Sequence, residues 1–353
     1  VRGTGFQPVK HGQDARATTN LGERLLALLR HPNIASKHWI IRQYDHEVQG
    51  GSVIKPLVGP HQVGPSDASV IRPKLSSHKG VVVACGLVPH VEAPYAMAIA
   101  AIDEAVRNAV CVGADLDKLA VLDNFCWPSV DDERTMGALV AACEACRDAA
   151  LAYGIPFISG KDSLHNQFTN SETGEVIRIP NTLLISAIGV IDDVRRCVTM
   201  DLKDPREGTL LLVTPRSDNP SLSELSSLHR AVSRVIRGGH AGAVHDVSDG
   251  GYLVSMAEMC IASGLGSTLS SDGPSEFFAE GNGGYVMEVH AQGVDAVEAA
   301  LRTHATVRRI GRTTAGPSAA LAVSSITPGR SEQFDLHVFV DDLTRAWRGT
   351  LDW

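Results

Sequence analysis

The hydrophobic and polar positions between residues 120 and 166 predict a strand, a helix and a second strand. One apolar run ends at Asp123, and a second, over residues 156–159, is followed by polar residues at 160–163. Between the two runs, residues 131–153 place alanines and larger apolar residues at helical spacing. In a parallel α/β sheet, polar residues at the carboxyl ends of such strands lie at the edge where ligands bind. The pattern therefore predicts a ligand site at this edge.

The polar residues at 160–163 suit a phosphate group. Gly160 lets the backbone approach a ligand closely, while Lys161, Asp162 and Ser163 supply a cation, a carboxylate and a hydroxyl. A Walker P-loop does not fit, because five residues rather than four separate Gly154 from Gly160. Asp162 also stands where serine or threonine would bind magnesium. An ordinary polar turn after a buried strand remains an open alternative.

The apolar periodicity of the whole chain predicts an α/β (α+β) protein of two domains. Residues 200–208 are charged and contain a proline and a glycine, as is typical of a domain boundary. We expect a first domain over residues 21–200 and a second over 206–330, with a disordered extension over 1–20 and a tail helix within 331–353. The expected helices span 23–29, 34–46, 95–112, 225–237, 252–263 and 294–304; the expected strands span 68–72, 80–84, 182–191, 209–214, 241–244, 285–289 and 306–311; residues 167–179 are expected to form a hairpin or loop.

The composition excludes several functional classes. A chain of 353 residues with 44% hydrophobic and 20% charged residues is typical of a globular protein with two cores. Its formal net charge of −8 argues against a nucleic-acid partner, although local cations and magnesium could still hold a nucleotide. There is no apolar run of membrane-spanning length, and the amino-terminal residues lack the apolar centre of a signal peptide. We therefore expect a cytoplasmic protein without a membrane or nucleic-acid partner.

The seven cysteines predict reduced, buried thiols. Their number is odd and they are scattered among apolar neighbours, which does not favour a disulfide framework. Cys143 and Cys146 form a single C-x-x-C inside the helix predicted over 131–153. No second pair completes a zinc site, so packing is the favoured interpretation of these two thiols.

Two further segments carry candidate chemistry. Glu104 and Asn108 are spaced four residues apart on a predicted helix, so they share one face and offer two hard oxygen donors suited to Mg²⁺. A solvated helix face is the alternative. The loop over residues 245–251, HDVSDGG, lies between a strand and a helix whose amino end would attract an anion. The alternative there is that Ser248 or Asp249 merely caps the helix.

Three motifs in this order, LDNFCWP, FISGKDSL and HDVSDGG, resemble the synthetase subunit of phosphoribosylformylglycinamidine synthase. That family belongs to the ATP-binding superfamily of aminoimidazole ribonucleotide (AIR) synthetase. The resemblance runs from about Asn33 to the carboxyl end. Family members carry two tandem copies of a two-domain unit, and this chain resembles the second copy. The resemblance implies an AIR-synthase-like N-terminal domain followed by the matching C-terminal α/β domain.

The resemblance also implies an activity. The family converts formylglycinamide ribonucleotide to formylglycinamidine ribonucleotide with ATP, Mg²⁺ and ammonia from glutamine. The implied partners are a glutamine amidotransferase subunit, a small accessory subunit, and either a separate first-half chain or a second copy of this chain. We expect this chain alone to be inactive. The alternatives are a non-catalytic nucleotide-binding module, or a kinase or synthetase of the same superfamily acting on another small substrate.

The implied site residues follow from the matching motif positions, and no catalytic residue is among them because the family's catalytic histidines lie in the first half. Lys161 stands where many short family members have a metal-binding asparagine, and residues 215–225 replace a glycine-rich stretch, so contacts from these two places are in doubt. The resemblance assigns Asp45, Glu104, Asn108 and Asp246 to the metal, Asp123, Gly160 and Ser248 to ATP, and Ser163 to the ribonucleotide.

Overall fold

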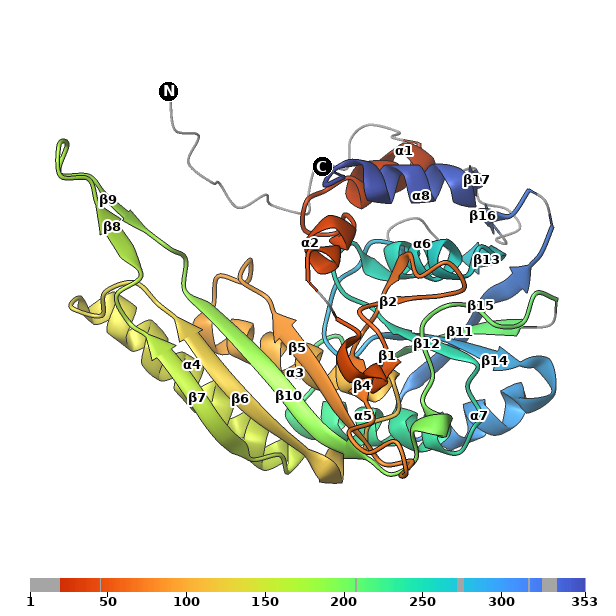
Figure 1. Cartoon of the computed structure of the whole chain (residues 1–353), viewed down its shortest axis with the longest axis horizontal. Coiled ribbons are helices and arrows are strands. Elements are labelled where there is room, and N and C mark those ends of the chain that lie inside the picture. Colours follow the sequence, from red (N-terminus) through yellow and green to blue (C-terminus); the bar gives the residue numbers. More distant parts are fainter. Residues whose placement is uncertain are drawn as a thin grey trace.

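A computed structural model describes residues 20–44, 46–206, 208–271, 276–316, 318–325 and 335–352. Its described residues form a mixed α/β fold with one sheet of six strands and another of seven, which lie side by side with helices packed on them (Figure 1). This confirms the predicted fold class. The extension predicted over residues 1–20 falls outside the described residues except for Asn20, and Asp45 is not described either.

The first sheet contains the strand–helix–strand unit that the sequence predicts. Its strand order is β1-β4-β5-β10-β6-β7, and β6 and β7 are parallel and joined by helix α4. Strand β10 lies antiparallel between β5 and β6, so the sheet is mixed. The elements of this part are α1 (Leu21–Leu29), α2 (His38–Arg42), β1 (Ser52–Ile54), β2 (Leu57–Val58), β3 (Gly64–Pro65), β4 (Ser69–Ile71), β5 (Gly80–Leu87), α3 (Pro94–Cys111), β6 (Leu119–Cys126), α4 (Glu133–Tyr153), β7 (Phe157–Ser163), β8 (Gln167–Thr169), β9 (Val176–Arg178) and β10 (Thr182–Ile191).

Three local expectations need correction. The polar residues at 160–163 belong to strand β7, not to a turn after it, and Asp123 lies inside β6. Strand β7 is at the edge of its sheet with most side chains exposed, so polar residues do not interrupt it. The helix expected over 34–46 is shorter in the structure, where α2 spans His38–Arg42. Before it, Lys37 Nζ donates to the carbonyls of residues 32, 33 and 35 and holds an irregular turn.

Helices α3 and α4 cover one face of the first sheet. Strand β5 alternates buried and exposed residues, and its buried side packs on α3. Helix α4 begins where the Asp132 carboxylate accepts from the Thr135 backbone N–H at 2.8 Å, and it ends at Gly154, whose φ is 69°. These end signals fix the length of the helix that joins β6 to β7.

The second sheet has the strand order β12-β14-β11-β15-β13-β16-β17. Strands β13, β16 and β17 were missed by the sequence pattern, since β13 is rich in serine and β17 falls where a tail helix was expected. The tail helix expected within residues 331–353 corresponds to α8, which is shorter than that segment. The elements are β11 (Gly208–Thr214), α5 (Leu222–Arg237), β12 (Ala243–Asp246), α6 (Gly251–Ser263), β13 (Gly266–Ser271), β14 (Tyr285–His290), α7 (Val294–Leu301), β15 (Thr306–Thr314), β16 (Ala320–Ser325), β17 (Asp335–Phe339) and α8 (Val340–Gly349).

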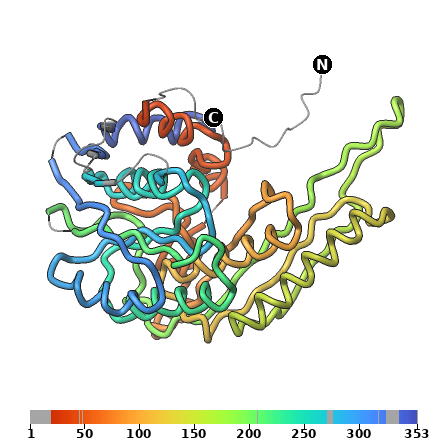
Figure 2. The backbone as a smooth tube through the Cα atoms, turned by 180° about the vertical axis from the view of Figure 1, so that it is seen from behind, coloured from red at the N-terminus to blue at the C-terminus, as the bar shows by residue number. Residues whose placement is uncertain are grey.

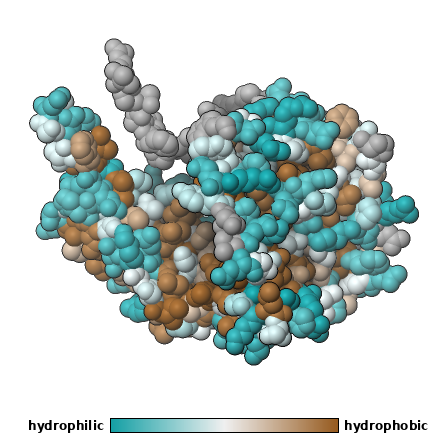
Figure 3. Space-filling view, in the orientation of Figure 1, coloured by the Kyte–Doolittle hydropathy of each residue, from teal (hydrophilic) through white to brown (hydrophobic). Residues whose placement is uncertain are grey.

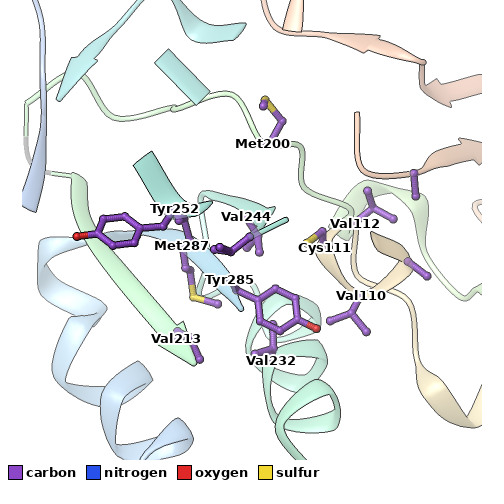
Figure 4. Close-up of a cluster of buried hydrophobic side chains, with 14 of the residues drawn as sticks. Val110, Cys111, Val112, Met200, Val213, Val232, Val244, Tyr252, Tyr285 and Met287 are labelled. Carbon is purple, nitrogen blue, oxygen red and sulfur yellow. The ribbon is translucent and has the colours of Figure 1, made fainter. Parts of the chain in front are cut away.

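A continuous hydrophobic core joins the two sheets. Figure 4 shows Val110 and Cys111 at the end of α3 near Tyr285 of β14 and Val232 of α5. All four are buried in one cluster. Because α3 belongs to the first sheet's layer and α5 and β14 to the second, hydrophobic burial holds the two parts in a fixed relation.

The cysteines only partly match the expectation of buried thiols. All seven are free, and Cys111, Cys146 and Cys260 are buried. Cys85 and Cys143, however, are exposed. Burial raises the pKa of Cys146 and Cys260 to about 12, so these thiols stay protonated and act as apolar packing groups.

Helices from the two ends of the described chain pack together. Figure 2 shows α1 and α8 side by side above the second sheet, and the two helices are in contact. The Trp347 indole N–H donates to the Ile34 carbonyl at 2.9 Å, and the Thr350 hydroxyl donates to the Arg30 carbonyl at 2.8 Å. None of the described helices is long and apolar enough to cross a membrane.

The face of the first sheet opposite α3 and α4 is apolar and uncovered. Val83 and Leu87 of β5 and Ile188 and Val190 of β10 are between 37% and 47% exposed. Figure 3 shows hydrophobic side chains gathered over this region. Beside it, strands β8 and β9 form the predicted hairpin, which projects from the body of the molecule (Figure 1). Val83 and Leu87, at one side of this face, also line a cavity.

The hairpin of β2 and β3 gives a test of packing against helix α6. At Gly59, φ is 88° and an added Cβ would lie 1.8 Å from the Ala262 carbonyl oxygen. We expect Gly59→Ala to lower the free energy of unfolding by about 2–3 kcal/mol, measured by urea denaturation. Gly174→Ala is the matched control, because Gly174 has φ 72° and open space around it. Equal losses in the two variants would show that the contact with α6 contributes nothing.

Candidate functional site

A cavity of about 840 Å³ lies where the two sheets meet. Glu104 and Asn108 reach it from α3, and Asp246 and Ser248 reach it from the end of β12 and the following loop. The fold thus brings together two pairs of side chains, Glu104 with Asn108 and Asp246 with Ser248, that are about 140 residues apart in the sequence. Three of them belong to the expected metal set; Asp45, the fourth, is not described.

Asp246 is fixed by contacts from three directions. Its carboxylate Oδ2 accepts from Arg107 Nε at 3.2 Å, and its backbone N–H donates to Asp67 Oδ1 at 3.0 Å. The Ser255 hydroxyl donates to its carbonyl oxygen at 2.8 Å. Burial raises the pKa of the Asp246 carboxyl, while Arg107 acts in the opposite direction. A cation beside Asp246 would favour the ionised form further.

Glu104 and Asn108 are both held by the last residues of β5. Glu104 Oε2 accepts from the Leu87 backbone N–H at 2.6 Å. Burial raises the pKa of the Glu104 carboxyl to about 7, against the opposing effect of Arg107. Asn108 Nδ2 donates to the Cys85 carbonyl at 2.9 Å, so its Oδ1 is left to accept or to bind a cation. The solvated-face alternative for this pair is therefore not what the structure shows, since both side chains have specific partners.

His245 occupies a buried position with carboxylates on both sides. Its Nδ1 lies 2.8 Å from Asp67 Oδ1, and its Nε2 lies 3.1 Å from Glu258 Oε2. The two carboxylates outweigh the effect of burial and raise the pKa of His245 well above its usual value. Both ring nitrogens are engaged by these carboxylates, so this histidine holds the loop that follows β12 in place.

The loop 245–251 does not cap the helix after it with a side chain. Helix α6 begins after Gly250, whose φ is 84°, and no side chain makes the capping hydrogen bond. The capping alternative for Ser248 and Asp249 is therefore wrong. Both side chains instead line the cavity in front of the helix. The first backbone N–H groups of α6 already have acceptors, because Gly250 donates to Glu280 Oε1 at 2.8 Å and Gly251 and Leu253 donate to the carbonyls of Ser248 and Phe277. An anion in the cavity would therefore be held by side chains and a cation rather than by this helix end.

The remaining predicted residues form a second, separate group on strands β6 and β7. Asp123 and Gly160 are register partners, and an added Cβ at Gly160 would lie 1.9 Å from Asp123 Oδ1. The Lys161 ammonium contacts the Ser163 hydroxyl. Partial burial, and more weakly Asp162, raises the pKa of Asp123. None of these residues lines the 840 Å³ cavity, so the two predicted sets do not form one site within this chain.

Sequence reasoning missed three residues that organise the cavity: Asp67, Arg107 and Glu258. The Asp103–Arg107 pair, spaced four residues apart on α3, was visible as a helical ion pair. Asp67 and Glu258 carried no such signal. Their partner His245 lies far from Asp67 in sequence, and it is on strand β12 whereas Glu258 is on helix α6, so no single helical or strand spacing connects them.

The donor set around the cavity fits a hard divalent cation. Glu104, Asn108 and Asp246 offer carboxylate and amide oxygens, the ligands that Mg²⁺ prefers. Ser248 adds a hydroxyl at the same cavity. The geometry therefore defines a candidate site for a hard divalent cation at the junction of two α/β layers.

Comparison with known proteins gives the class to which this architecture belongs. The chain matches the family model "FGAR-AT PurM_N-like domain" over residues 36–190 and "AIR synthase related protein, C-terminal domain" over residues 208–324. It therefore belongs to the AIR synthase-related family.

Within that family the chain is related to subunit PurL of phosphoribosylformylglycinamidine synthase. It is 32% identical to the PurL of Rhodospirillum rubrum over 326 aligned residues, which cover 84% of this chain and 42% of that protein. The PurL of Deinococcus radiodurans is also 32% identical, over 94% of this chain and 46% of its own length. The chain thus spans under half the length of these curated relatives.

Solved structures share the fold. The PurL of T. maritima complexed with ADP superposes with a TM-score of 0.67 at 16% identity, covering 93% of this chain and 52% of that one. A chain of the HypE–HypF complex gives a TM-score of 0.55 at 15% identity, covering 77% of this chain and 92% of its own. At these identities the likeness establishes the fold alone.

Proposed function

We propose that this chain binds ATP or ADP with Mg²⁺ in the cavity between its two sheets. The observation that carries the proposal is the meeting of Glu104, Asn108 and Asp246 in one cavity between the two sheets. Bound Mg²⁺ would neutralise phosphate charge. Asp246 and Glu104 would supply its carboxylate ligands, Asn108 an amide oxygen, and Ser248 a hydroxyl toward the nucleotide. T. maritima PurL has been solved with ADP and with ATP, which supports a nucleotide as the ligand.

We further propose that the chain is part of a ligase that makes formylglycinamidine ribonucleotide in purine synthesis. ATP would activate the substrate's amide oxygen as a phosphate, which ammonia then displaces. In this proposal Asp123 and Gly160 contact ATP at the reacting site and Ser163 contacts formylglycinamide ribonucleotide. The relation to PurL supports this assignment, and T. maritima PurL has also been solved with FGAR. We expect such a step to take place in the cytoplasm.

The open apolar face of the first sheet gives this proposal a partner surface. Val83, Leu87, Ile188 and Val190 lie on it, next to the β6–β7 group that is to hold the substrate. We propose that a first-half polypeptide or a second copy of this chain covers the face. A glutamine amidotransferase and a small accessory subunit would complete the assembly; the solved PurLQS structure of T. maritima is consistent with such partners.

A non-catalytic nucleotide-binding module is the second candidate. The observation that favours it is that the residues of the β6–β7 group do not line the cavity. A nucleotide could therefore bind in the cavity even if no reaction takes place at Asp123, Gly160 and Ser163. In either case we propose the same division of the chain, with a first domain over 21–200 and a second over 206–330.

The metal assignment predicts a difference between two neighbouring carboxylates. Asp246→Asn should weaken binding of ADP with Mg²⁺ by about tenfold or more, because it removes a charged ligand from the cation. Asp249→Asn should change it by about twofold at most, since Asp249 is outside the proposed set. Isothermal calorimetry on the two variants measures this. Absence of heat with the unchanged protein at millimolar ADP, or equal losses in both variants, would contradict the assignment.

A further inference from the structure

Next to the nucleotide cavity lies a second, smaller one of about 260 Å³ with a different donor set. His90, Asp249 and Glu280 line it, and one ligand atom of each lies within 4.8 Å of the others. His90 belongs to the turn between β5 and α3, Asp249 to the loop before α6, and Glu280 to the loop before β14. Three loops distant in sequence thus bring an imidazole and two carboxylates to one point.

Two of these loops are already fixed to each other. Glu280 Oε1 accepts from the Gly250 backbone N–H at 2.8 Å, which fixes the Glu280 side chain to the residue that follows Asp249. Glu104, whose Oε2 holds the Leu87 backbone N–H, fixes the start of the loop that carries His90. The cluster is therefore supported from the backbone on both sides, although the His90 and Glu280 side chains are themselves exposed.

We propose that His90, Asp249 and Glu280 bind a zinc-type divalent cation, separate from the magnesium proposed at Glu104, Asn108 and Asp246. Two carboxylates balance the charge of the cation, and an imidazole nitrogen selects zinc over magnesium. Zinc–ligand bonds near 2.1 Å place tetrahedral ligand atoms about 3.4 Å apart. Side-chain rotations that move the ligand atoms by about 1 Å would therefore bring them to bonding distance from the ion. Water supplies the fourth ligand.

A cation here would tie the two parts of the fold together. His90 belongs to the first sheet's layer, while Asp249 and Glu280 belong to the second. His90 and Asp249 both line the larger cavity as well as the smaller one. Binding would therefore hold the loop over residues 88–93 across the mouth of the larger cavity. Because the ion binds only where the three loops meet, it should also stabilise the folded state.

The test is a zinc titration of the chelator-treated protein in excess Mg²⁺, followed by calorimetry and by the rise in melting temperature. We expect one zinc per chain with a micromolar Kd, and His90→Ala should weaken binding by about tenfold or more. The control is His61→Ala, another exposed histidine, which should leave binding unchanged. The visible spectrum of bound Co²⁺ gives a second signal, which His90→Ala should abolish.

Two further variants separate this site from its neighbours. Glu280→Gln should impair zinc binding and spare ADP with Mg²⁺, because Glu280 lines the smaller cavity and not the larger one, while Asp246→Asn should do the reverse. Cys143→Ser should have no effect on zinc binding. Zinc affinity that is equal in His90→Ala and the unchanged protein, that is lost in Cys143→Ser, or that never saturates below about 100 µM would overturn the site. Failure of nucleotide binding with zinc binding intact would instead overturn only the proposed function.

Discussion

Asp103→Asn is expected to lower the free energy of unfolding by about 3–5 kcal/mol, the range for removing one partner of a buried ion pair. Asp103 is fully buried on α3. Its Oδ1 lies 2.8 Å from His229 Nε2 on α5, and the Tyr153 hydroxyl at the end of α4 donates to the same oxygen at 3.1 Å. Its Oδ2 pairs with Arg107 and accepts from the Gly283 backbone N–H at 3.0 Å.

The expected loss is large because this one carboxylate joins elements from both parts of the fold. An asparagine in its place would remove one of the two ion pairs of Arg107 described in this structure and leave the pair with Asp246. It would also turn an acceptor into a donor facing other donors. Urea denaturation measures the change. Asp117→Asn is the control, since Asp117 pairs with Arg230 at an exposed position and should contribute about 1 kcal/mol or less. Similar losses in the two variants would contradict the special role of Asp103.

The same carboxylate predicts a pH dependence. Burial by itself raises the pKa of Asp103, but His229 and Arg107 outweigh it and hold the pKa at about 2, below the ordinary 3.8. A depressed pKa contributes stability that is present above pH 3.8 and is lost as the pH falls toward 2. The difference in stability between the unchanged protein and Asp103→Asn should therefore shrink between pH 5 and pH 2.5. A difference that stays constant over this window would rule out the ionised form as its source.

The sequence predicted those parts of the site that depend on local pattern. The apolar runs before Asp123 and Gly160, with a helix between, were enough to predict parallel neighbours, and the structure pairs these two residues in register. The i, i+4 spacing placed Glu104 and Asn108 on one face of α3, and both line the large cavity. The family resemblance added Asp246, which no local pattern connects to α3.

What the sequence did not predict depends on contacts between distant segments. The pairing of Arg107 with both Asp103 and Asp246, and of His245 with both Asp67 and Glu258, exists only once the two layers pack. The extension of β7 through Ser163 was missed because polar residues normally end a buried strand, whereas an edge strand tolerates them. The same polarity hid β13, which is held by pairing with β15 and β16.

The separation of two predicted residue sets also has consequences for assembly. The nucleotide cavity is built from both layers of this one chain, so it should form without a partner. The β6–β7 group lies instead on one sheet, beside the open apolar face and the projecting hairpin. In the proposed assembly, the groups that complete that second site would come from the polypeptide that covers the face.

We accordingly expect the 353-residue polypeptide alone to make no formylglycinamidine ribonucleotide, even if it binds ADP with Mg²⁺. The side chains proposed for the reaction, Asp123 and Ser163, lie on β6 and the edge strand β7, and most of β7 is exposed. The exposure of β7 leaves this position open to water. Holding ammonia and the activated amide within reacting distance would therefore need further groups around it. The curated relatives that carry PurL names are more than twice as long as the matched region.

The assay is ATP-dependent amidine formation from formylglycinamide ribonucleotide with ammonium as the nitrogen source, so that no glutaminase is needed. Calorimetry with ADP and Mg²⁺ on the same preparation shows whether the protein is folded and competent to bind. Turnover of about one per second by the chain alone, an ordinary enzymatic rate, would refute the expectation. Turnover that appears only when a separately expressed first-half polypeptide is added would show that the open sheet face is where the reacting site is completed. Ser163→Ala should then abolish most of that restored activity while leaving ADP binding in the cavity intact, because the two residue sets serve different sites.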